Sequence, residues 1–227
     1  MATLGNSNKI IVGAAQMFVS TAGALEYVNA SGSGSAAVYN FGSGSVSGIP
    51  AFTSDGSTYA DKMDAAANFR NVGFTMNGLE VQFQPDFGEV QVDQLLDVAK
   101  LYKQGMQVNM VTAFAEATLE NLLVTIAGSD SDLTGPSGIR TLDMKSGELG
   151  SVPVERALVA VGPGSGDPEA VDATKVERVY VANRALSIDN VTVSAKRDEP
   201  SMFEVSFRLL PASNGSYGKI VDRVVGA

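Results

Sequence analysis

Apolar and polar residues alternate in two neighbouring stretches of the chain, residues 79–84 (LEVQFQ) and 89–94 (EVQVDQ). Strict alternation is typical of a β-strand that buries one face. Residues 85–88 (PDFG) lie between them and contain turn-forming proline, aspartate and glycine. The pattern therefore predicts a hairpin of two strands with one apolar and one polar face. The polar positions are Glu80, Gln82, Gln84, Glu89, Gln91 and Asp93.

Strand patterns recur along the rest of the chain. Residues 10–19 (IIVGAAQMFV) favour a buried strand, with a helix as the alternative because of the GAAQM segment. The C-terminal stretch, residues 211–227, contains NGSYGKIVDRVV and fits either an added strand or an arm. Apolar patterns also predict strands at residues 106–114, 154–162, 175–185, 190–196 and 203–210.

Residues 115–127 have the clearest helix pattern. Four apolar residues recur at helical spacing on one face, and Gly128 follows as a natural helix end. Residues 95–105 (LLDVAKLYKQG) also have a helical period, and residues 59–73 fit a short helical turn. The apolar face of the clearest helix consists of Leu119, Leu122, Leu123 and Ile126.

Together these patterns predict a mainly β protein with a single domain, residues 1–227. The expected architecture is an antiparallel β-sandwich or partial barrel with one flanking α-helix and long loops. The longest loop, residues 29–58, is rich in Gly and Ser. It is either a flexible surface loop or a segment that becomes ordered against a partner. Its candidate anchors are Tyr39, Phe41, Ile49 and Phe52.

Composition limits the chemistry. The chain has 227 residues, a formal net charge of −9, and neither Cys nor His. No disulfide, Ser-His-Asp triad, Cys-His pair or His-ligated zinc site can therefore form. The negative charge argues against wrapping of a nucleic-acid backbone, which requires clustered Lys and Arg. The start of the chain does not resemble a secretory signal, and residues 10–19 are about half the length of a membrane helix, so we expect a soluble protein without a membrane partner.

The acidic residues do not form a convincing active site. Glu89 and Asp93 on one strand would lie about 13 Å apart, at about 3.3 Å per residue. Glycoside hydrolysis uses carboxyl groups roughly 5 to 9.5 Å apart, so a solvated or pore-facing polar face is the better interpretation. Asp130 and Asp132 have the spacing that opens a calcium loop, but the later ligands are missing. The Gly-rich segments lack the Lys of a phosphate loop. We expect no catalytic residue, metal or cofactor.

Four segments in order resemble the major tail tube protein of long, non-contractile-tailed bacteriophages. In that family a Gly-Phe-Thr-x-x-Gly turn leads into a strand, a further strand ends in Val-Asp-Gln, and another runs into an Ala-Glu-x-Thr-Leu-Glu-Asn helix. A closing strand ends in a Phe-Arg-x-Leu-Pro-like motif before Tyr-Gly-x-Ile-Val-Asp. The matching segments are NVGFTMNGLEV (71–81), FGEVQVDQ (87–94), MQVNMVTAFAEATLENLLVTIAG (106–128) and KRDEPSMFEVSFRLLPASNGSYGKIVDR (196–223).

The resemblance implies a structural virion protein rather than an enzyme. Such proteins form hexameric rings that stack into a hollow tube with a β-barrel lumen, through which double-stranded DNA passes into the host. The implied partners are further copies of the chain and other tail proteins, such as the tape measure and the tail terminator. The implied location is the phage tail, after synthesis in the host cytoplasm. The six polar hairpin positions then become lumen candidates, residues 29–58 the ring-stacking loop and residues 115–127 an outer helix.

Three other interpretations remain open at this point. A tube protein of a contractile tail or secretion system would associate with a separate sheath. A carbohydrate-binding β-sandwich on a virion surface would present a platform of aromatic residues, but aromatic residues make up only 7% of the chain and Trp is absent. A carboxylate glycosidase is disfavoured by the spacing of Glu89 and Asp93.

Overall fold

The computed structural model describes residues 13–28, 38–41, 48–91, 97–136, 138–143, 153–166, 174–193, 197 and 201–226. Most of the secondary structure is strand, with two short α-helices. The elements in chain order are β1 (Gln16–Ser20), β2 (Leu25–Val28), β3 (Val38–Phe41), α1 (Tyr59–Asp64), β4 (Phe69–Asn71), β5 (Thr75–Gln91), β6 (Val98–Phe114), α2 (Leu119–Thr125), a 3-10 turn (Asp130–Asp132), β7 (Leu133–Thr134), β8 (Thr141–Leu142), β9 (Arg156–Pro163), β10 (Val176–Ser187), β11 (Phe203–Leu210) and β12 (Gly218–Val224).

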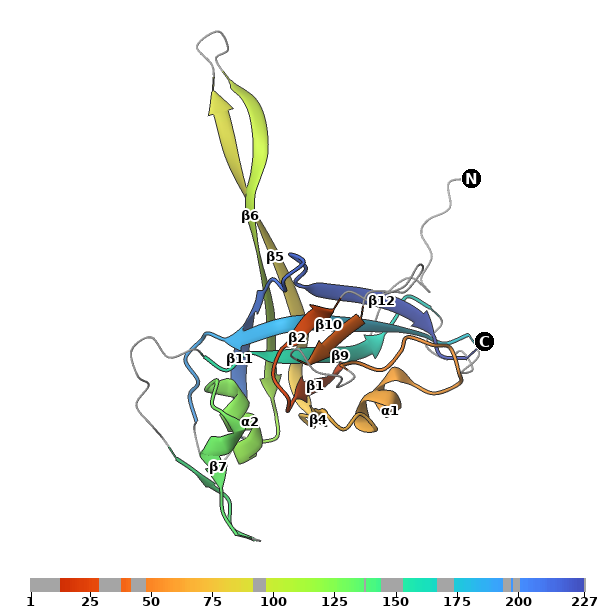
Figure 1. The fold of residues 1–227 in the computed structure, drawn as a ribbon, viewed down its shortest axis with the longest axis vertical. Helices are drawn as coiled ribbons and strands as arrows, with labels where there is room; N and C mark the ends of the chain where they lie inside the picture. Colours follow the sequence, from red (N-terminus) through yellow and green to blue (C-terminus); the bar gives the residue numbers. More distant parts are fainter. Residues whose placement is uncertain are drawn as a thin grey trace.

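Eight strands form one antiparallel sheet in the order β4-β1-β9-β10-β11-β6-β5, and β12 joins it beside β10 (Figure 1). β9 lies along one edge of β10. The other edge is shared, because Val176–Ala182 pairs with β12 and Arg184–Ser187 pairs with β11. The sheet therefore divides at β10 into a short branch with β12 and a longer branch that ends in β5. The prediction of a mainly β, antiparallel protein is confirmed, but the described strands do not close into a barrel.

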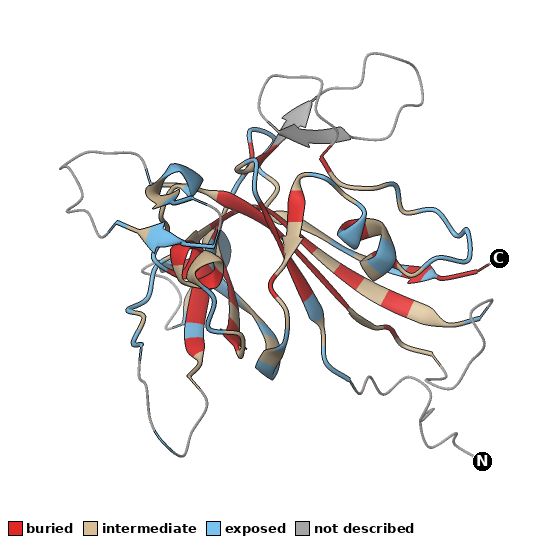
Figure 2. Cartoon of the chain, turned by 90° about the horizontal axis from the view of Figure 1, so that it is seen from below, coloured by how far each residue is buried: buried red, intermediate tan, exposed pale blue. Residues whose placement is uncertain are grey.

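The central strand β9 is buried on both faces. Leu158 and Ala160 belong to one apolar cluster, whereas Ala157, Val159 and Val161 belong to a second cluster on the opposite side. A strand that is covered on both faces requires apolar residues at every position, which explains the continuous ALVAV sequence. Figure 2 shows the buried residues gathered on the central strands.

The longer branch of the sheet folds back over β1 and β9. The first apolar cluster brings Met17 and Val19 of β1 together with Phe114 of β6 and Phe207 of β11. The two phenylalanine rings lie 6.3 Å apart between their centroids, in a tilted arrangement. Three strands separate β1 from β6 in the sheet, so one apolar cluster that contains residues of both requires strong curvature. A single curved sheet thus encloses a core of the kind expected for a sandwich.

A buried ion pair holds α1 against the other face of the sheet. Glu177 on β10 and Arg223 on β12 are cross-strand partners, with 3.0 Å between Oε2 and Nη1. The same Glu177 oxygen accepts a hydrogen bond from the backbone N–H of Tyr59, the first residue of α1, at 2.9 Å. Arg223 also donates to the carbonyl groups of Thr53 (2.7 Å) and Ser57 (3.1 Å). The pair therefore joins the loop before α1 to two strands.

α2 is shorter than the predicted helix at residues 115–127. It begins after Thr118, whose hydroxyl accepts a hydrogen bond from the backbone N–H of Asn121. Its predicted apolar face is only partly buried, because the helix ends at Thr125 and Ile126 starts the turn that follows, with 48% exposure. Of the other predicted positions, Leu123 is buried, and Leu119 and Leu122 are half-buried.

The turn after α2 places an alanine where glycine is usually found. The backbone N–H of Gly128 donates to the carbonyl of Leu123, and the N–H of Ala127 donates to the carbonyl of Val124. These two hydrogen bonds together define the Schellman motif, in which the first residue beyond the helix cap has a left-handed backbone. That residue is Ala127, with a φ of 53°. The sequence prediction of Gly128 as the helix end therefore missed by one residue.

We expect the Ala127→Gly substitution to raise the free energy of unfolding by about 0.5 to 1 kcal/mol. The left-handed conformation costs an L-residue about 1 to 2 kcal/mol, and the greater freedom of glycine in the unfolded chain offsets part of the gain. Urea denaturation followed by circular dichroism measures the change. Ala65→Gly is the matched control, because Ala65 caps α1 with an ordinary φ of −79°. Equal effects of the two substitutions would contradict the assignment.

The predicted turn at Pro85–Gly88 is wrong, because β5 runs through it from Thr75 to Gln91. β5 pairs along its length with β6, and Pro85 lies opposite Met106. Among the described residues β5 pairs with no other strand, and the edge of a sheet tolerates a proline that cannot donate a ladder hydrogen bond. Gly88 is covered by the side chains of Tyr102 and Gln104 from β6. Proline and glycine here mark an edge strand rather than a turn.

Three further predictions also need correction. The helix predicted at residues 95–105 is wrong for its described part, because Val98–Phe114 is a strand. The first eight side chains of this strand are mostly exposed, so the spacing of their apolar residues does not reflect burial. The predicted strand at 190–196 has no strand in its described residues, 190–193. Part of the predicted loop at 29–58 is strand β3, paired with β2. Within 211–227, β12 settles the open choice in favour of an added strand.

Candidate functional site

The β5–β6 hairpin is the feature that most distinguishes this fold. Each strand has 17 residues, and the pair projects away from the body of the molecule and from both helices (Figure 1). β6 pairs with β11 only through Asn109–Phe114, so among the described residues its first half pairs with β5 alone. The hairpin therefore has a proximal half within the sheet and a distal half that extends beyond it.

The proximal half has one polar face. Gln82 lies opposite Asn109 and Gln84 lies opposite Gln107, and directly opposed side chains in an antiparallel pair project from the same face. Glu80 shares this face, and its carboxylate accepts a hydrogen bond from the Gln82 amide at 3.0 Å. The prediction that Glu80, Gln82 and Gln84 form one polar face is confirmed. The same alternation and register place Asp86, Glu204, Ser206 and Arg208 on this face.

Glu89 and Gln91 do not continue this polar face. The register shift near Asp86 adds Gln104 to β6 and leaves the alternation of β5 unbroken. Odd-numbered residues of β5 therefore share the face of Phe83 and Phe87, opposite the face of Glu80. The prediction that all six positions share one polar face is therefore wrong for Glu89 and Gln91, whose backbone positions belong to the Phe83 face. The Glu89 side chain is exposed on that face. Asp93 lies outside the described residues.

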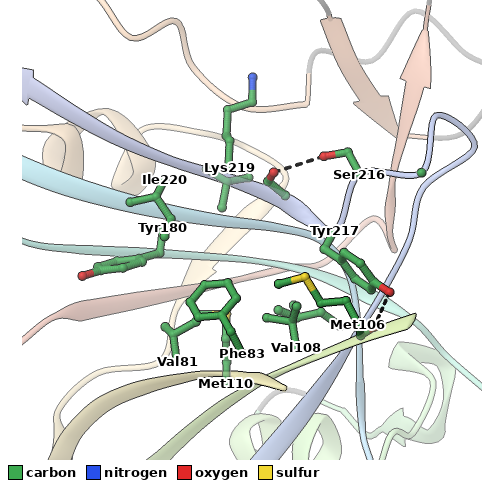
Figure 3. A pocket seen from close by; sticks show the side chains of 14 residues that line it. Val81, Phe83, Met106, Val108, Met110, Tyr180, Ser216, Tyr217, Lys219 and Ile220 are labelled. Carbon is green, nitrogen blue, oxygen red and sulfur yellow. Dashed lines mark hydrogen bonds between the residues drawn. The ribbon is translucent and has the colours of Figure 1, made fainter. Parts of the chain in front are cut away.

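The opposite face of the proximal half is apolar and borders a groove. Val81, Phe83 and Pro85 of β5 lie opposite Met110, Val108 and Met106 of β6. A cavity of about 270 Å³ separates this face from β10 and β12 (Figure 3). Its further lining includes Tyr180, Val181, Leu209, Tyr217 and Ile220.

One hydrogen bond ties the two sides of the groove together. The hydroxyl of Tyr217, just before β12, donates to the carbonyl of Met106 on β6 at 2.6 Å (Figure 3). Phe83 and Ile220 nevertheless remain 51% exposed at the groove. Large half-exposed apolar side chains around a cavity are typical of a surface that another molecule covers. The sequence patterns indicated apolar strands here but not that two branches of the sheet would meet.

The distal half of the hairpin carries further exposed apolar residues. Phe87 is 55%, Leu101 60% and Tyr102 46% exposed. Phe87 follows Phe83 on the odd face of β5, and Glu89 lies opposite Leu101. On this face Phe87 and Leu101 extend the apolar surface toward the tip, where they alternate with Glu89 and Lys103. Tyr102 lies opposite Gly88 and projects from the other face.

The four predicted anchors of the 29–58 loop have different positions. Ile49 and Phe52 pack against the second apolar cluster, and the ring of Phe52 stacks on Tyr59 at 4.8 Å. Burial raises the pKa of Tyr59, so its hydroxyl stays protonated and donates to the carbonyl of Pro50 at 2.8 Å. Tyr39 and Phe41 lie on β3, but their side chains are outside the described part. Ile49 and Phe52 therefore pack within the subunit.

The two acidic residues with calcium-loop spacing have other roles. Asp130 forms an ion pair with Arg156 at 2.8 Å, and Asp132 completes a capping box with Ser129. Within the described residues no group of three or more acidic side chains is placed to hold a metal ion. The chemistry that the described hairpin offers is hydrogen bonding on one face and apolar contact on the other.

Comparison with protein-family models found no match for the chain, and comparison with curated proteins found no relative. Neither of the two α-helices in the described ranges is long and apolar enough to cross a membrane.

Proposed function

We propose that this chain is a self-assembling structural protein whose copies form stacked hexameric rings of a phage tail tube. The observation that carries the proposal is the two-faced β5–β6 hairpin at the edge of the sheet. Its polar face suits contact with water in a lumen, and its apolar face suits contact with protein. In this arrangement Glu80, Gln82 and Gln84 face the lumen through which double-stranded DNA passes.

The unpaired edge of β5 supports edge-to-edge assembly. Among the described residues β5 pairs only with β6, so alternate residues along this 17-residue strand present backbone groups at its outer edge. Natural proteins usually protect such long edges, and closure of neighbouring hairpins into a ring removes them. The lumen face would carry Glu80, Asp86 and Glu204 against one base, Arg208. A mainly acidic wall repels the phosphate backbone, so DNA would pass without being held.

The proposal predicts that the purified chain forms rings or hollow tubes as its concentration rises. Negative-stain electron microscopy and light scattering measure this directly. Phe83→Ser, at the exposed groove, should shift assembly to at least tenfold higher concentration, because burial of a large apolar side chain contributes about 1.5 to 3 kcal/mol.

Phe74→Ser is the matched control. Phe74 is 79% exposed in the turn before β5 and lies outside the groove, so the variant should assemble normally. A chain that stays monomeric at all concentrations and salt conditions would rule out the tube. Assembly only together with a separate sheath protein would favour a contractile-tail or secretion tube instead.

A further inference from the structure

A second cavity, of about 220 Å³, lies between α2, β1, β4 and the start of β9 and is lined by an unusual set of charges. Three guanidinium groups and only two carboxylates border it, together with apolar residues of α2 and β1. The charged lining residues are Arg70, Arg140, Arg156, Glu120 and Asp130. They come from five separate places in the chain, so only the fold brings them together.

Arg156 is almost completely buried, with 5% of its side chain exposed. Its terminal nitrogens donate to the carbonyls of Ser20 (3.0 Å) and Gly128 (2.9 Å) and to the carboxylate of Asp130. Its Nε–H is also buried but has no acceptor among the described residues. A buried donor without an acceptor is costly, and such groups often mark a place where an ion or water binds.

Arg70 lacks a carboxylate partner. Its Nη1 donates to the side-chain oxygen of Asn121 at 2.7 Å, and its Nη2 donates to the backbone carbonyl of Glu120 at 3.1 Å. Both acceptors are neutral, and no carboxylate of the described chain lies within ion-pair distance. Burial lowers the pKa of Arg70 and the charge of Arg156 lowers it further, whereas the carboxylates of Glu120 and Asp130 raise it in part. The positive charge at Arg70 is therefore only partly compensated.

Arg140 is the most exposed guanidinium of the set. Its side chain is 65% exposed, and its Nε lies 3.9 Å from the Glu120 carboxylate, at the outer limit of an ion pair. Such an exposed pair contributes little, so the guanidinium can turn toward the cavity at small cost.

We propose that this cavity is a binding site for a single small oxyanion, held by Arg70 and Arg156 and closed over by Arg140. Guanidinium groups present donors in a planar fork that matches the oxygens of a phosphate or carboxylate. An oxyanion supplies the negative charge that Arg70 lacks and an acceptor for the Nε–H of Arg156. Inorganic phosphate and the carboxylate of an acidic side chain from another molecule offer this same chemistry. The site is separate from the hairpin and does not depend on tube assembly.

Thermal unfolding of the full chain with added phosphate or acetate, against chloride at equal ionic strength, tests the site. We expect the free energy of unfolding to rise with the logarithm of anion concentration above the dissociation constant, with a rise in Tm of about 3 to 6 °C at about ten times that constant. A logarithmic rise with phosphate alone assigns a tetrahedral anion, whereas a logarithmic rise with acetate as well assigns a carboxylate. Phosphate also stabilises proteins non-specifically by exclusion from their surface, but that effect grows in proportion to concentration.

Variants separate anion binding in the cavity from non-specific stabilisation by phosphate. Arg70→Gln should lose the logarithmic rise, and Arg140→Gln should weaken the apparent affinity several-fold. Arg140 is exposed, so its variant folds even where Arg70→Gln does not. Arg208→Gln is the control, because it removes the same charge from an exposed position on β11. No logarithmic rise in the unmodified chain, or an equal rise in Arg140→Gln and Arg208→Gln, would overturn the proposal.

Discussion

The Glu177→Ala variant should lose about 3 to 5 kcal/mol of unfolding free energy, because it removes the buried counter-charge of Arg223 and leaves only the exposed carboxylate of Asp55, 3.9 Å away. The side chains of the two residues are 7% and 3% exposed. The substitution also removes the acceptor for the backbone N–H of Tyr59, so the start of α1 loses its link to β10. Urea denaturation at low protein concentration, followed by circular dichroism, measures the loss.

The same two strands supply a matched control. Arg178 and Asp222 are also cross-strand partners on β10 and β12, with 2.6 Å between Nε and Oδ1, but their side chains are 27% and 42% exposed. Exposed pairs contribute about 0 to 1 kcal/mol, so Asp222→Ala should have a small effect. Similar losses in Glu177→Ala and Asp222→Ala would contradict our account of the buried pair.

A double substitution tests whether the missing counter-charge, rather than lost contact, causes the effect. Glu177→Met with Arg223→Met removes both charges and keeps much of the apolar volume. Such replacements of buried ion pairs are often close to neutral. We therefore expect the double variant to be more stable than Glu177→Ala, with the carbonyls of Thr53 and Ser57 left to find other donors.

A chain in which residues 87–104 are replaced by Asn-Gly should fold normally but fail to form tubes. Asp86 and Gly105 are cross-strand partners, and Asn-Gly is the preferred two-residue turn between such positions. The described part of the removed segment is mostly exposed, so the free energy of unfolding should change by no more than about 1 kcal/mol. The removed segment includes the exposed side chains of Phe87 and Leu101 on the apolar face of the hairpin, and that of Tyr102 on the opposite face.

Electron microscopy and thermal unfolding of the shortened chain separate the two outcomes. Loss of tubes with an unchanged Tm supports the hairpin as the assembly surface. Normal tubes would show that assembly uses another surface, whereas a large fall in Tm would show that the distal half stabilises the subunit.

Periodicity predicted the strands whose burial follows their own sequence. The strands predicted at residues 203–210 and 154–162 match β11 and β9. β11 turns Phe203, Val205, Phe207 and Leu209 toward the core, and β9 is buried from Arg156 to Val161. Both strands were predicted because burial leaves an apolar pattern in the sequence. The polar face at Glu80, Gln82 and Gln84 was found for the same reason.

Periodicity did not predict the correct secondary structure where the side chains of a segment are mostly exposed. The described part of residues 95–105 is held as strand by backbone pairing with β5, although its side chains are mostly exposed. Pro85 and Gly88 carry turn chemistry that an edge strand accepts equally well, so the local sequence could not distinguish a turn from a long strand. Only the pairing partner, β6, decides between them.

The sequence by itself determined a mainly β chain without His or Cys, the faces of its buried strands and the position of α2. The tertiary structure alone decided which surfaces are brought together: the groove between β6 and β12, the pair of Glu177 and Arg223, and the cavity that joins Arg70 to Arg156. The local pattern of apolar and polar residues indicates which side chains of a segment face water and which face the core. Contacts between distant segments depend on the curvature and branching of the sheet, which no single segment encodes.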